Sequence, residues 1–253
     1  MIQVTMMYKC RACGSENIVK NGRNKAGSAQ YHCKDCGAYR VLASKSAEQP
    51  ERRRQVLQAY RERASLRGLG RIFGVARQSV LKWLADQVEQ LPSLVESLLP
   101  KQAGDILELD ELWAFVYQRD NERWLWTALC RRTRQIVAFV IGDRSAATCR
   151  RLWQAIPPAY RRCRTYTDFW KAYQAVLPKR THHPVDKETG QTAHQERWYL
   201  TLRQRVSRFV RKTLSFSKSE RNHELVTRWF IVQYNLSTSP IWVESECLKR
   251  YKR

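Results

Sequence analysis

The 253-residue sequence predicts a multidomain protein in which a small cysteine-rich module and a helical module precede a larger α/β domain. Four of the eight cysteines fall within the first 36 residues, as two close pairs. A stretch with helical spacing of apolar residues follows, over about residues 48–89. From Asp105 onward, short segments rich in aromatic and β-branched residues alternate with helical ones, which is typical of an α/β domain. The predicted boundaries are 1–46, 47–88, a linker at 89–104, and 105–253.

The net charge predicts a polyanionic partner. Forty-six Lys and Arg residues stand against 23 Asp and Glu residues, which gives a formal net charge of +23. Nucleic acid is the usual partner of such a chain, because each phosphate that is neutralised releases condensed counterions. Anionic membranes also attract basic proteins, but no apolar run approaches the roughly 20 residues that a membrane span needs. The first residues lack a secretory pattern, so we expect the protein inside the cell and not in a membrane.

The cysteine pairs predict a structural zinc ribbon. Cys10 with Cys13, and Cys33 with Cys36, form two CxxC knuckles that are each followed by glycine, with 19 residues between them. Zn(II) takes four thiolates in a tetrahedron, and the glycine permits the positive φ of a tight knuckle. A redox CxxC would not explain two knuckles in register. A closed four-thiolate site supports folding and docking, not catalysis. His32, next to Cys33, is an alternative zinc ligand.

The helical module has the layout of a helix-turn-helix. Gly74 separates two short amphipathic segments, with Leu69 on the apolar stripe before it and Val80 and Leu84 on the stripe after it. The second helix would enter a major groove. An ordinary helical hairpin with a solvated basic face is the alternative. The side chains that lie off the stripe and would face DNA are Arg77, Gln78, Ser79 and Lys82.

The α/β domain begins with three consecutive segments that read as antiparallel strands, separated by charged turns. These strands cover Ile106–Tyr117, Arg123–Cys130 and Gln135–Ile141. A helix from about Ser145 to Trp153 follows and stops at a pair of prolines. The remaining predicted elements are a strand at Arg164–Thr167, a helix at Phe169–Val176, a strand at His182–Val185, a basic helix from His194 to about Phe209, and an apolar helix at Leu225–Tyr234.

Acidic residues are scarce, so their positions carry information. Asp110 lies between Glu108 and Glu111 in an otherwise apolar strand, Asp168 ends the fourth strand, and Glu196 begins the basic helix. Half-buried carboxylates are costly unless they are paired or bound to metal. An acid on the first strand, one after the fourth and one on a later helix is the arrangement of ribonuclease-H-like nucleotidyl transferases. There the carboxylates converge on two Mg(II) (or Mn(II)) ions, which clamp the attacking and leaving oxygens.

The basic helix carries further candidates. Arg203 lies two turns after Glu196, so both share one face, where Arg203 can contact a DNA phosphate beside the metals. In the alternative interpretation, Asp168 caps the next helix and Glu196 only favours a helix N-terminus. An apolar stripe from Trp198 to Phe209 would pack inward. The residues left for contacts with the DNA backbone are Arg205, Arg208, Arg211 and Lys212.

Several of these strings resemble transposases of the insertion-sequence-one family. The resemblance rests on the four N-terminal cysteines, on Asp-Glu-Leu-Trp at 110–113, on Thr-Asp-Phe-Trp-Lys-Ala-Tyr at 167–173, and on the run at 196–218. It covers nearly the whole chain and is weakest at 87–104. It implies a catalytic triad with a basic partner and a bacterial, cytoplasmic, nucleoid-associated enzyme. The residues to which the resemblance assigns the triad and its partner are Asp110, Asp168, Glu196 and Arg203.

The resemblance also implies a reaction. The enzyme would nick the 3′ ends of an insertion element and join them to target DNA by two-metal phosphoryl transfer. Its partners would be double-stranded DNA, as element ends and target, and at least one more copy of the chain. Glu108, on the same strand face as Asp110, would support the site, while Glu188 is a weaker rival of Glu196 and His194 could position water or phosphate. A non-catalytic DNA-binding regulator and a tyrosine recombinase are the other two classes of protein that fit the composition.

Overall fold

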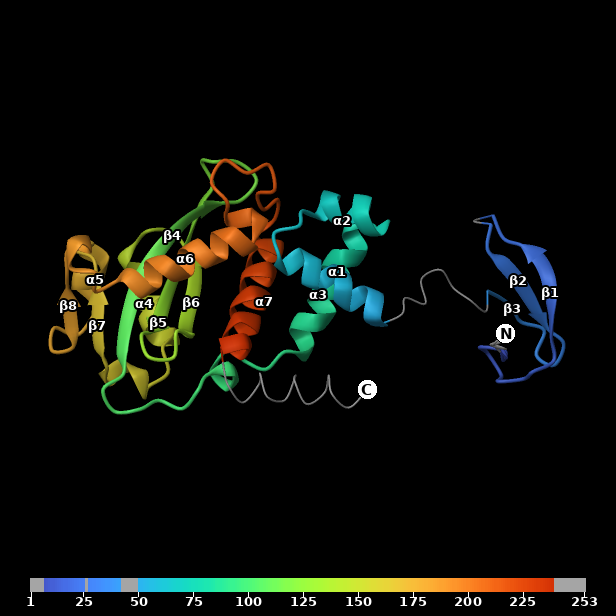
Figure 1. Ribbon diagram of the computed structural model, residues 1–253, viewed down its shortest axis with the longest axis horizontal. Helices are drawn as coiled ribbons and strands as arrows, with labels where there is room; N and C mark the ends of the chain where they lie inside the picture. Colours follow the sequence, from blue (N-terminus) through green and yellow to red (C-terminus); the bar gives the residue numbers. More distant parts are fainter. Residues whose placement is uncertain (1–6, 26, 42–49, 239–253) are drawn as a thin grey trace, which may run out of the picture. The chain divides into compact units, whose positions relative to one another are not determined.

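The computed structural model describes residues 7–25, 27–41 and 50–238, which fall into two compact units divided between Gln55 and Val56 (Figure 1). The first unit holds a three-stranded antiparallel sheet in the order β1-β2-β3. A β-hairpin joins β1 and β2, with Ile18 paired to Cys33 and Lys20 to Tyr31. These strands are β1 (Ile18–Arg23), β2 (Ala29–Cys33) and β3 (Tyr39–Arg40).

Three helices occupy the segment predicted to be a helix-turn-helix. They are α1 (Pro50–Arg61), α2 (Leu66–Phe73) and α3 (Arg77–Gln90). Ser65 caps α2 by accepting a hydrogen bond from the N–H of Gly68, and Gly74 ends the helix with a φ of 63°, a value that favours glycine. The helices and the turn therefore lie where the sequence predicted them.

The larger unit is built on a mixed five-stranded sheet in the order β6-β5-β4-β7-β8. Strands β6, β5 and β4, from one edge of the sheet to its centre, are antiparallel, as predicted. Strands β7 and β8 run parallel to β4 and continue the sheet to its other edge. The strands are β4 (Ile106–Phe115), β5 (Glu122–Cys130), β6 (Ile136–Gly142), β7 (Arg164–Thr167) and β8 (His182–Pro184).

Helices cover both faces of this sheet (Figure 1). On one face, Trp126 and Leu109 pack with Leu152 of α4 and Tyr173 of α5. The remaining elements are α4 (Ala146–Ala155), α5 (Lys171–Val176), α6 (Ala193–Arg205), α7 (Glu220–Thr238), and the short 3₁₀ helices η1 (Val95–Ser97), η2 (Tyr160–Arg162), η3 (Lys187–Thr189) and η4 (Ser207–Phe209).

The other face of the sheet shares one hydrophobic cluster with α6, α7 and the first three helices. Leu112 and Leu125 of the sheet, Phe230 of α7, and Val80 and Leu84 of α3 are all buried in it. The indole N–H of Trp229 also donates to Gln87 Oε1 at 2.8 Å, which joins α7 to α3. From Val56 onward, the helical segment and the sheet therefore belong to the same compact unit.

The segment predicted as a linker, 89–104, packs against the sheet. The amide of Gln135 is fully buried, and it donates to the carbonyl of Ser97 and accepts from the N–H of Leu99. Asn235 of α7 bonds with both the N–H and the carbonyl of Ile136, the first residue of β6. The connecting chain and the end of α7 are thus fixed to the same strand.

Several predicted boundaries differ from the structure: α5 begins at Lys171 and not at Phe169, and α7 covers Glu220–Thr238 and not only Leu225–Tyr234. The basic helix α6 ends at Arg205, not near Phe209, because Val206 has an extended backbone and a 3₁₀ turn follows. Val206 and Phe209 are nevertheless buried, as the apolar stripe predicted. Strand β4 ends at Phe115, and Val116 makes an isolated bridge with Ser217. Among the helices within the described ranges, none is long and apolar enough to cross a membrane.

Candidate functional site

The four N-terminal cysteines converge on one point. Their sulfur atoms all lie within 4.8 Å of one another, with Cys10 Sγ 3.7 Å from Cys36 Sγ and Cys13 Sγ 3.6 Å from Cys33 Sγ. Four thiolates around a zinc ion at about 2.3 Å stand about 3.8 Å apart, so the cluster has the dimensions of a tetrahedral site. His32 stacks on Tyr39 and lies outside this cluster of described ligands.

The two knuckles repeat the same backbone geometry. The N–H of Gly14 donates to the carbonyl of Cys10, and that of Gly37 to the carbonyl of Cys33. Both glycines have positive φ, 77° and 71°, which is the reason for a glycine after each pair. Backbone N–H donors, chiefly that of Ala12, lower the pKa of Cys10 to about 6, which favours the thiolate that binds zinc.

A carboxylate joins the knuckles to each other. Asp35 accepts hydrogen bonds from Ser15 Oγ and from Asn17 Nδ2, at 2.5 and 2.8 Å. These donors lower the pKa of Asp35, so it stays ionised. The residues present fit a structural zinc ion, which would be fully enclosed by protein ligands.

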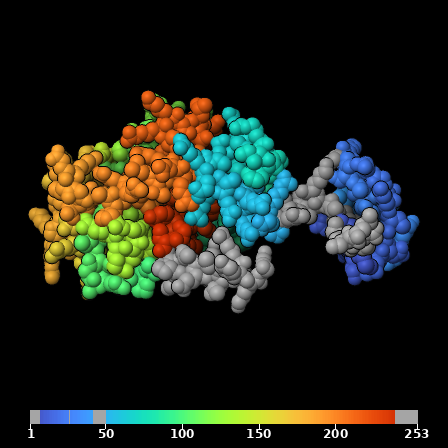
Figure 2. Space-filling model, viewed as in Figure 1, coloured from blue at the N-terminus to red at the C-terminus, as the bar shows by residue number. Residues whose placement is uncertain are grey.

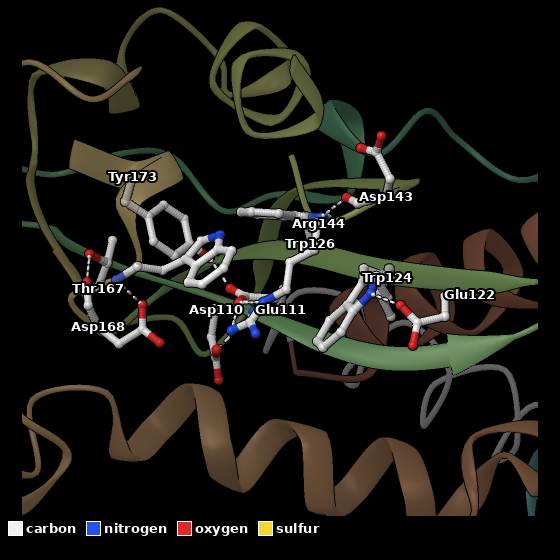
Figure 3. Close-up of polar contacts among 12 residues, drawn as sticks. Asp110, Glu111, Glu122, Trp124, Trp126, Asp143, Arg144, Thr167, Asp168 and Tyr173 are labelled. Atoms are coloured by element: carbon white, nitrogen blue, oxygen red, sulfur yellow. Dashed lines mark hydrogen bonds and ion pairs between the residues drawn. The ribbon is translucent and has the colours of Figure 1, made fainter. Parts of the chain in front are cut away.

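A second cluster of ligands lies where β4 and β7 run side by side. Glu108 pairs with Tyr166 in a parallel register, so Asp168, two residues further along, arrives beside Asp110. Carboxylate oxygens of Asp110, Glu111 and Asp168 lie within 4.8 Å of one another (Figure 3). The sequence thus predicted the convergence of Asp110 and Asp168 correctly.

The electrostatics of Asp110 favour a cation. Burial, and then the nearby carboxylates of Glu111 and Asp168, raise the pKa of Asp110 to about 7. The backbone N–H of Glu111 donates to Asp110 Oδ1 at 2.8 Å and only partly offsets this effect. Asp168 Oδ1 accepts from the N–H of Trp170 at 3.0 Å, so Asp168 also caps the chain that leads into α5. A divalent cation would relieve the repulsion within this cluster.

Glu111 is the carboxylate that sequence reasoning left out of the site. Strand alternation turns it to the α4 and α5 face, as expected, where it accepts from Tyr173 Oη at 2.7 Å and from Arg144 Nε at 2.8 Å. The Arg144 guanidinium stacks over the rings of Trp124 and Trp170 (Figure 3). Strand alternation places neighbouring carboxylates on opposite faces, so it misses that Asp110 and Glu111, in the middle of β4, both lie near Asp168 just after β7.

Glu108 anchors the start of α6. Its carboxylate is fully buried and accepts the N–H groups of His194 and Gln195, the His194 ring nitrogen at 2.6 Å, and Arg131 Nε at 2.7 Å. A carboxylate at a helix N-terminus stabilises the helix because it lies at the positive end of the helix dipole. His194 is therefore engaged with Glu108, and Glu108 supports the site without belonging to the carboxylate cluster.

A chain of hydrogen bonds then ties α6 to the Asp110 backbone. Gln195 Nε2 bonds with Thr127 Oγ1 at 2.6 Å, and Thr127 with Tyr199 Oη at 2.8 Å. Tyr199 Oη donates to the carbonyl of Asp110 at 2.7 Å. All three side chains are buried. A polar residue opposite Asp110 on β5 and a Tyr one turn after Glu196 were signals for this contact.

The structure places the predicted third acid, Glu196, outside the carboxylate cluster, while its predicted basic partner Arg203 lies within reach of the charge of Asp110. Glu196 is exposed on the first turn of α6, one turn before Tyr199, and is outside the group of described carboxylates that lie within 4.8 Å. Arg203 is half-buried, and its Nε has no hydrogen-bond partner within the described ranges. Burial lowers the pKa of Arg203. Glu188 is exposed in η3.

The predicted DNA-contacting residues fall into two groups. On α3, Arg77, Gln78 and Lys82 are exposed and Ser79 is half-buried, beside the buried Val80. Following α6, Arg211 and Lys212 are exposed.

Two other residues that were predicted to contact DNA instead make contacts within the protein. Arg205 pairs with Glu62, and Arg208 donates to Tyr60 Oη and Ser217 Oγ. Because α6 ends at Arg205, the chain turns there and brings these two arginines to the end of α1.

Comparison with known proteins identifies the family of the region that contains these carboxylates. The family model for the IS1 transposase matches residues 105–236. The insertion element iso-IS1n protein InsB of Shigella dysenteriae is 38% identical over 131 residues, which cover 51% of this chain and 95% of that protein. The IS1 protein InsB of Shigella flexneri is 40% identical over 47% of this chain and 88% of its own length. The IS1 4 protein InsB of Escherichia coli K12 is 39% identical over 47% of this chain and 69% of its own length.

The matched region spans β4 to α7 and contains both carboxylate-bearing strands, the anchored helix α6 and Arg203. Membership in a transposase family implies that the protein binds DNA. The chain belongs to the IS1 transposase family.

Proposed function

We propose that the protein is a DDE transposase, which nicks the 3′ ends of an insertion element and joins them to target DNA by two-metal phosphoryl transfer. The observation that carries the proposal is the convergence of Asp110 and Asp168 from adjacent parallel strands, with Glu111 beside them. The mixed sheet, with three antiparallel strands followed by two parallel ones, supports a ribonuclease-H-like domain.

Asp110 and Asp168 would hold two Mg(II) or Mn(II) ions, and Glu196 would complete the ligand set from α6. Hard cations of this kind take carboxylate oxygens, and a pair of them clamps the attacking and leaving oxygens of a phosphodiester. Because its surroundings raise the pKa of Asp110 to about 7, Asp110 would release its remaining proton to water when a divalent ion binds. Tyr199 holds the Asp110 backbone in place through its carbonyl.

Arg203 would bind the phosphate that is cut. Its Nε is buried without a hydrogen-bond partner among the described residues, on the same face of α6 as Glu196. The negative charge of Asp110 acts on its guanidinium. A guanidinium suits the two oxygens of a phosphodiester because it offers parallel N–H donors. The positions on α3 and the exposed Arg211 and Lys212 would contact DNA beyond the reacting bond.

The N-terminal cluster would hold structural zinc, and the proposed reaction on two element ends calls for at least a dimer on DNA. In a Cys33→Ser variant we expect the bound zinc, measured by atomic absorption, to fall from one ion per chain to well below that. Unchanged zinc content would contradict the ribbon.

The decisive experiment is a strand-nicking assay with candidate element ends and Mg(II). We expect Asp168→Asn to abolish 3′-end nicking while DNA affinity stays within about twofold, because the carboxylate binds metal and not DNA. Asp120→Asn, which changes an exposed acid in the turn after β4, is the matched control and should nick normally.

Two outcomes would overturn the proposal. If Asp168→Asn leaves nicking intact, the carboxylate cluster is not catalytic, and a DNA-binding regulator becomes the better assignment. Nicking that persists after chelation of all divalent ions would instead favour a covalent tyrosine mechanism.

A further inference from the structure

A basic cleft lies between the helix-turn-helix segment and the chain that follows α6. It has a volume of about 1140 Å³ and is lined on one side by α2 and the start of α3, and on the other by residues between Ser207 and Asn222. Figure 2 shows the residues of α1 and α2 in cyan against the orange residues of α6 and its continuation. Both walls belong to the unit that begins at Val56.

The lining of this cleft carries positive charge without any acid. Its cations are Arg67, Arg71, Arg77, Arg208 and Lys218, and its lining includes no Asp or Glu. All of them except Arg208 are exposed, and within the described ranges the four exposed cations have no acidic partner. Five uncompensated charges around one hollow concentrate a positive potential there.

The far wall of the cleft is fixed in position. The N–H of Tyr117 donates to the carbonyl of Ser217 at 2.7 Å, just past the end of β4. Ser217 Oγ is buried and bonds with His223 Nδ1 at 2.7 Å, while Arg208 Nη1 donates to it at 3.1 Å. Lys218 therefore projects from a segment that is held by β4 and by the start of α7.

The near wall is fixed as well. Gly70 approaches the backbone so closely that an added Cβ would stand 3.3 Å from the carbonyl oxygen of Val75. The Ser65 cap and the buried Leu69 hold α2 in place, and Arg67 and Arg71 lie one turn apart on it. The two rows of cations thus face the cleft before any partner binds, which lowers the ordering cost of binding.

We propose that this cleft, which joins the start of the recognition helix α3 to α2 and to the segment after α6, binds the sugar–phosphate backbone of duplex DNA at a site distinct from the carboxylate cluster. This inference rests on the proposed function, since it supplies the grip that holds DNA for cutting. Proteins that hold DNA bind its phosphate oxygens with the charged groups of arginine and lysine, the hydroxyl group of serine and the amide group of asparagine. Ser65, Ser207, Ser215 and Asn222 complete the lining in this way.

The test compares two double variants of the full chain at equal net charge. Arg67→Gln/Lys218→Gln removes one cation from each wall, and Arg150→Gln/Arg151→Gln removes two exposed cations from α4, on the opposite face of the sheet. Binding of a duplex oligonucleotide is followed by fluorescence anisotropy across a salt series. For the cleft variant, we expect affinity at 0.1 M salt to fall by about tenfold and the log–log salt slope to shrink by about two.

For the α4 variant, we expect affinity to stay within about twofold of the unsubstituted chain. Equal affinity and slope for both variants would overturn the proposal. So would a cleft variant that binds DNA normally but changes its self-association, because the cleft would then hold an acidic segment of a second copy.

A phosphate-ethylation interference assay locates the contact. With the unsubstituted chain, we expect ethylation of phosphates away from the nicked bond to block binding, and with Arg67→Gln/Lys218→Gln we expect that signal to disappear. Interference confined to phosphates near the nick would contradict the cleft. Failure of the proposed function appears separately, as nicking by Asp168→Asn, and neither result depends on the other.

Discussion

At the scale of single residues, burial raises the pKa of three carboxyl groups on β4, those of Glu108, Asp110 and Glu111. Asp110 is crowded by Glu111 and Asp168, whereas Glu111 has Arg144 and Tyr173 as partners. Glu108 is more deeply buried than either and is fully hydrogen-bonded. Three acids on one strand therefore differ in their partners: Asp110 is the proposed metal ligand, Glu111 pairs with Arg144 and Tyr173 beside it, and Glu108 anchors α6.

The raised pKa of Asp110 makes the metal-free protein less stable at high pH. The unfolded carboxyl ionises near pH 4 and the folded one near pH 7, so this group stabilises the fold below pH 4 and loses that contribution as pH rises toward 7. Asp110→Asn removes the loss. At pH 8 without added divalent ions, we expect the variant to be more stable by about 2 kcal/mol, allowing for partial access of water, or about 4–8 °C in melting temperature.

Differential scanning fluorimetry checks this expectation. At pH 4.5 the two proteins should melt within about 2 °C of each other, and added Mg(II) at pH 8 should raise the melting temperature of the unsubstituted chain only. A variant that melts lower than the unsubstituted chain at pH 8 would show that Asp110 is stabilised as a carboxylate by some other group.

The sequence predicted those parts of the site that depend on local pattern. Asp110, Asp168 and the four cysteines lie together because strand order and CxxC spacing determine their neighbours. Glu111 was missed because its role depends on Arg144, a residue in a turn that no periodicity describes. Arg205 and Arg208 make contacts within the protein because the helix stops before Val206. The spacing of apolar residues does not show where a single residue changes its backbone conformation.

At the scale of elements, α6 is held against the sheet mainly by polar contacts at its first two turns. Glu108 receives the helix N-terminus, and Tyr199 reaches the Asp110 carbonyl. Because Glu196 and Arg203 are on the same helix, these contacts also determine where the proposed third ligand and the phosphate-binding arginine lie.

We expect Glu108→Gln to lower the rate of nicking by at least tenfold while DNA affinity changes little. The substitution breaks the ion pair with Arg131. Removal of one partner of a fully buried pair costs about 3–5 kcal/mol of unfolding free energy, and we expect a smaller loss here because Arg131 is partly exposed. Urea unfolding measures that loss, and a nicking assay separates kcat from KM. Glu188→Gln, at an exposed position of η3, should leave both unchanged.

An opposite result for Glu108→Gln would be informative. If nicking falls only in proportion to the unfolded fraction, α6 does not need its anchor to present its side chains. Partial rescue by Glu108→Asp, which keeps the charge, would separate positioning from packing.

At the scale of the whole molecule, the chain has two compact units with different sources of stability. The second unit has two large hydrophobic clusters, one on each face of its sheet. In its described residues, the first unit has a small sheet, four converging thiols and the start of α1. A module of that size would depend on a bound metal ion for folding.

We therefore expect a zinc chelator to unfold the first unit alone. All nine tryptophans lie at or after position 83, so tryptophan fluorescence reports on the second unit. The thermal transition followed by this signal should shift by less than about 2 °C after chelation. Hydrogen exchange at residues 10–40 should rise by orders of magnitude, because their hydrogen bonds would be lost. A large shift in the tryptophan signal would mean that the units stabilise each other.

The contact between Asn235 and Ile136 has a consequence for how copies of the chain can meet. Strand β6 is an edge of the sheet, and an unpaired edge invites a strand from another molecule to add to it. The amide of Asn235 satisfies both backbone groups of Ile136, much as a neighbouring strand would. At its first residue, this border of the sheet is thus already closed to intermolecular strand addition.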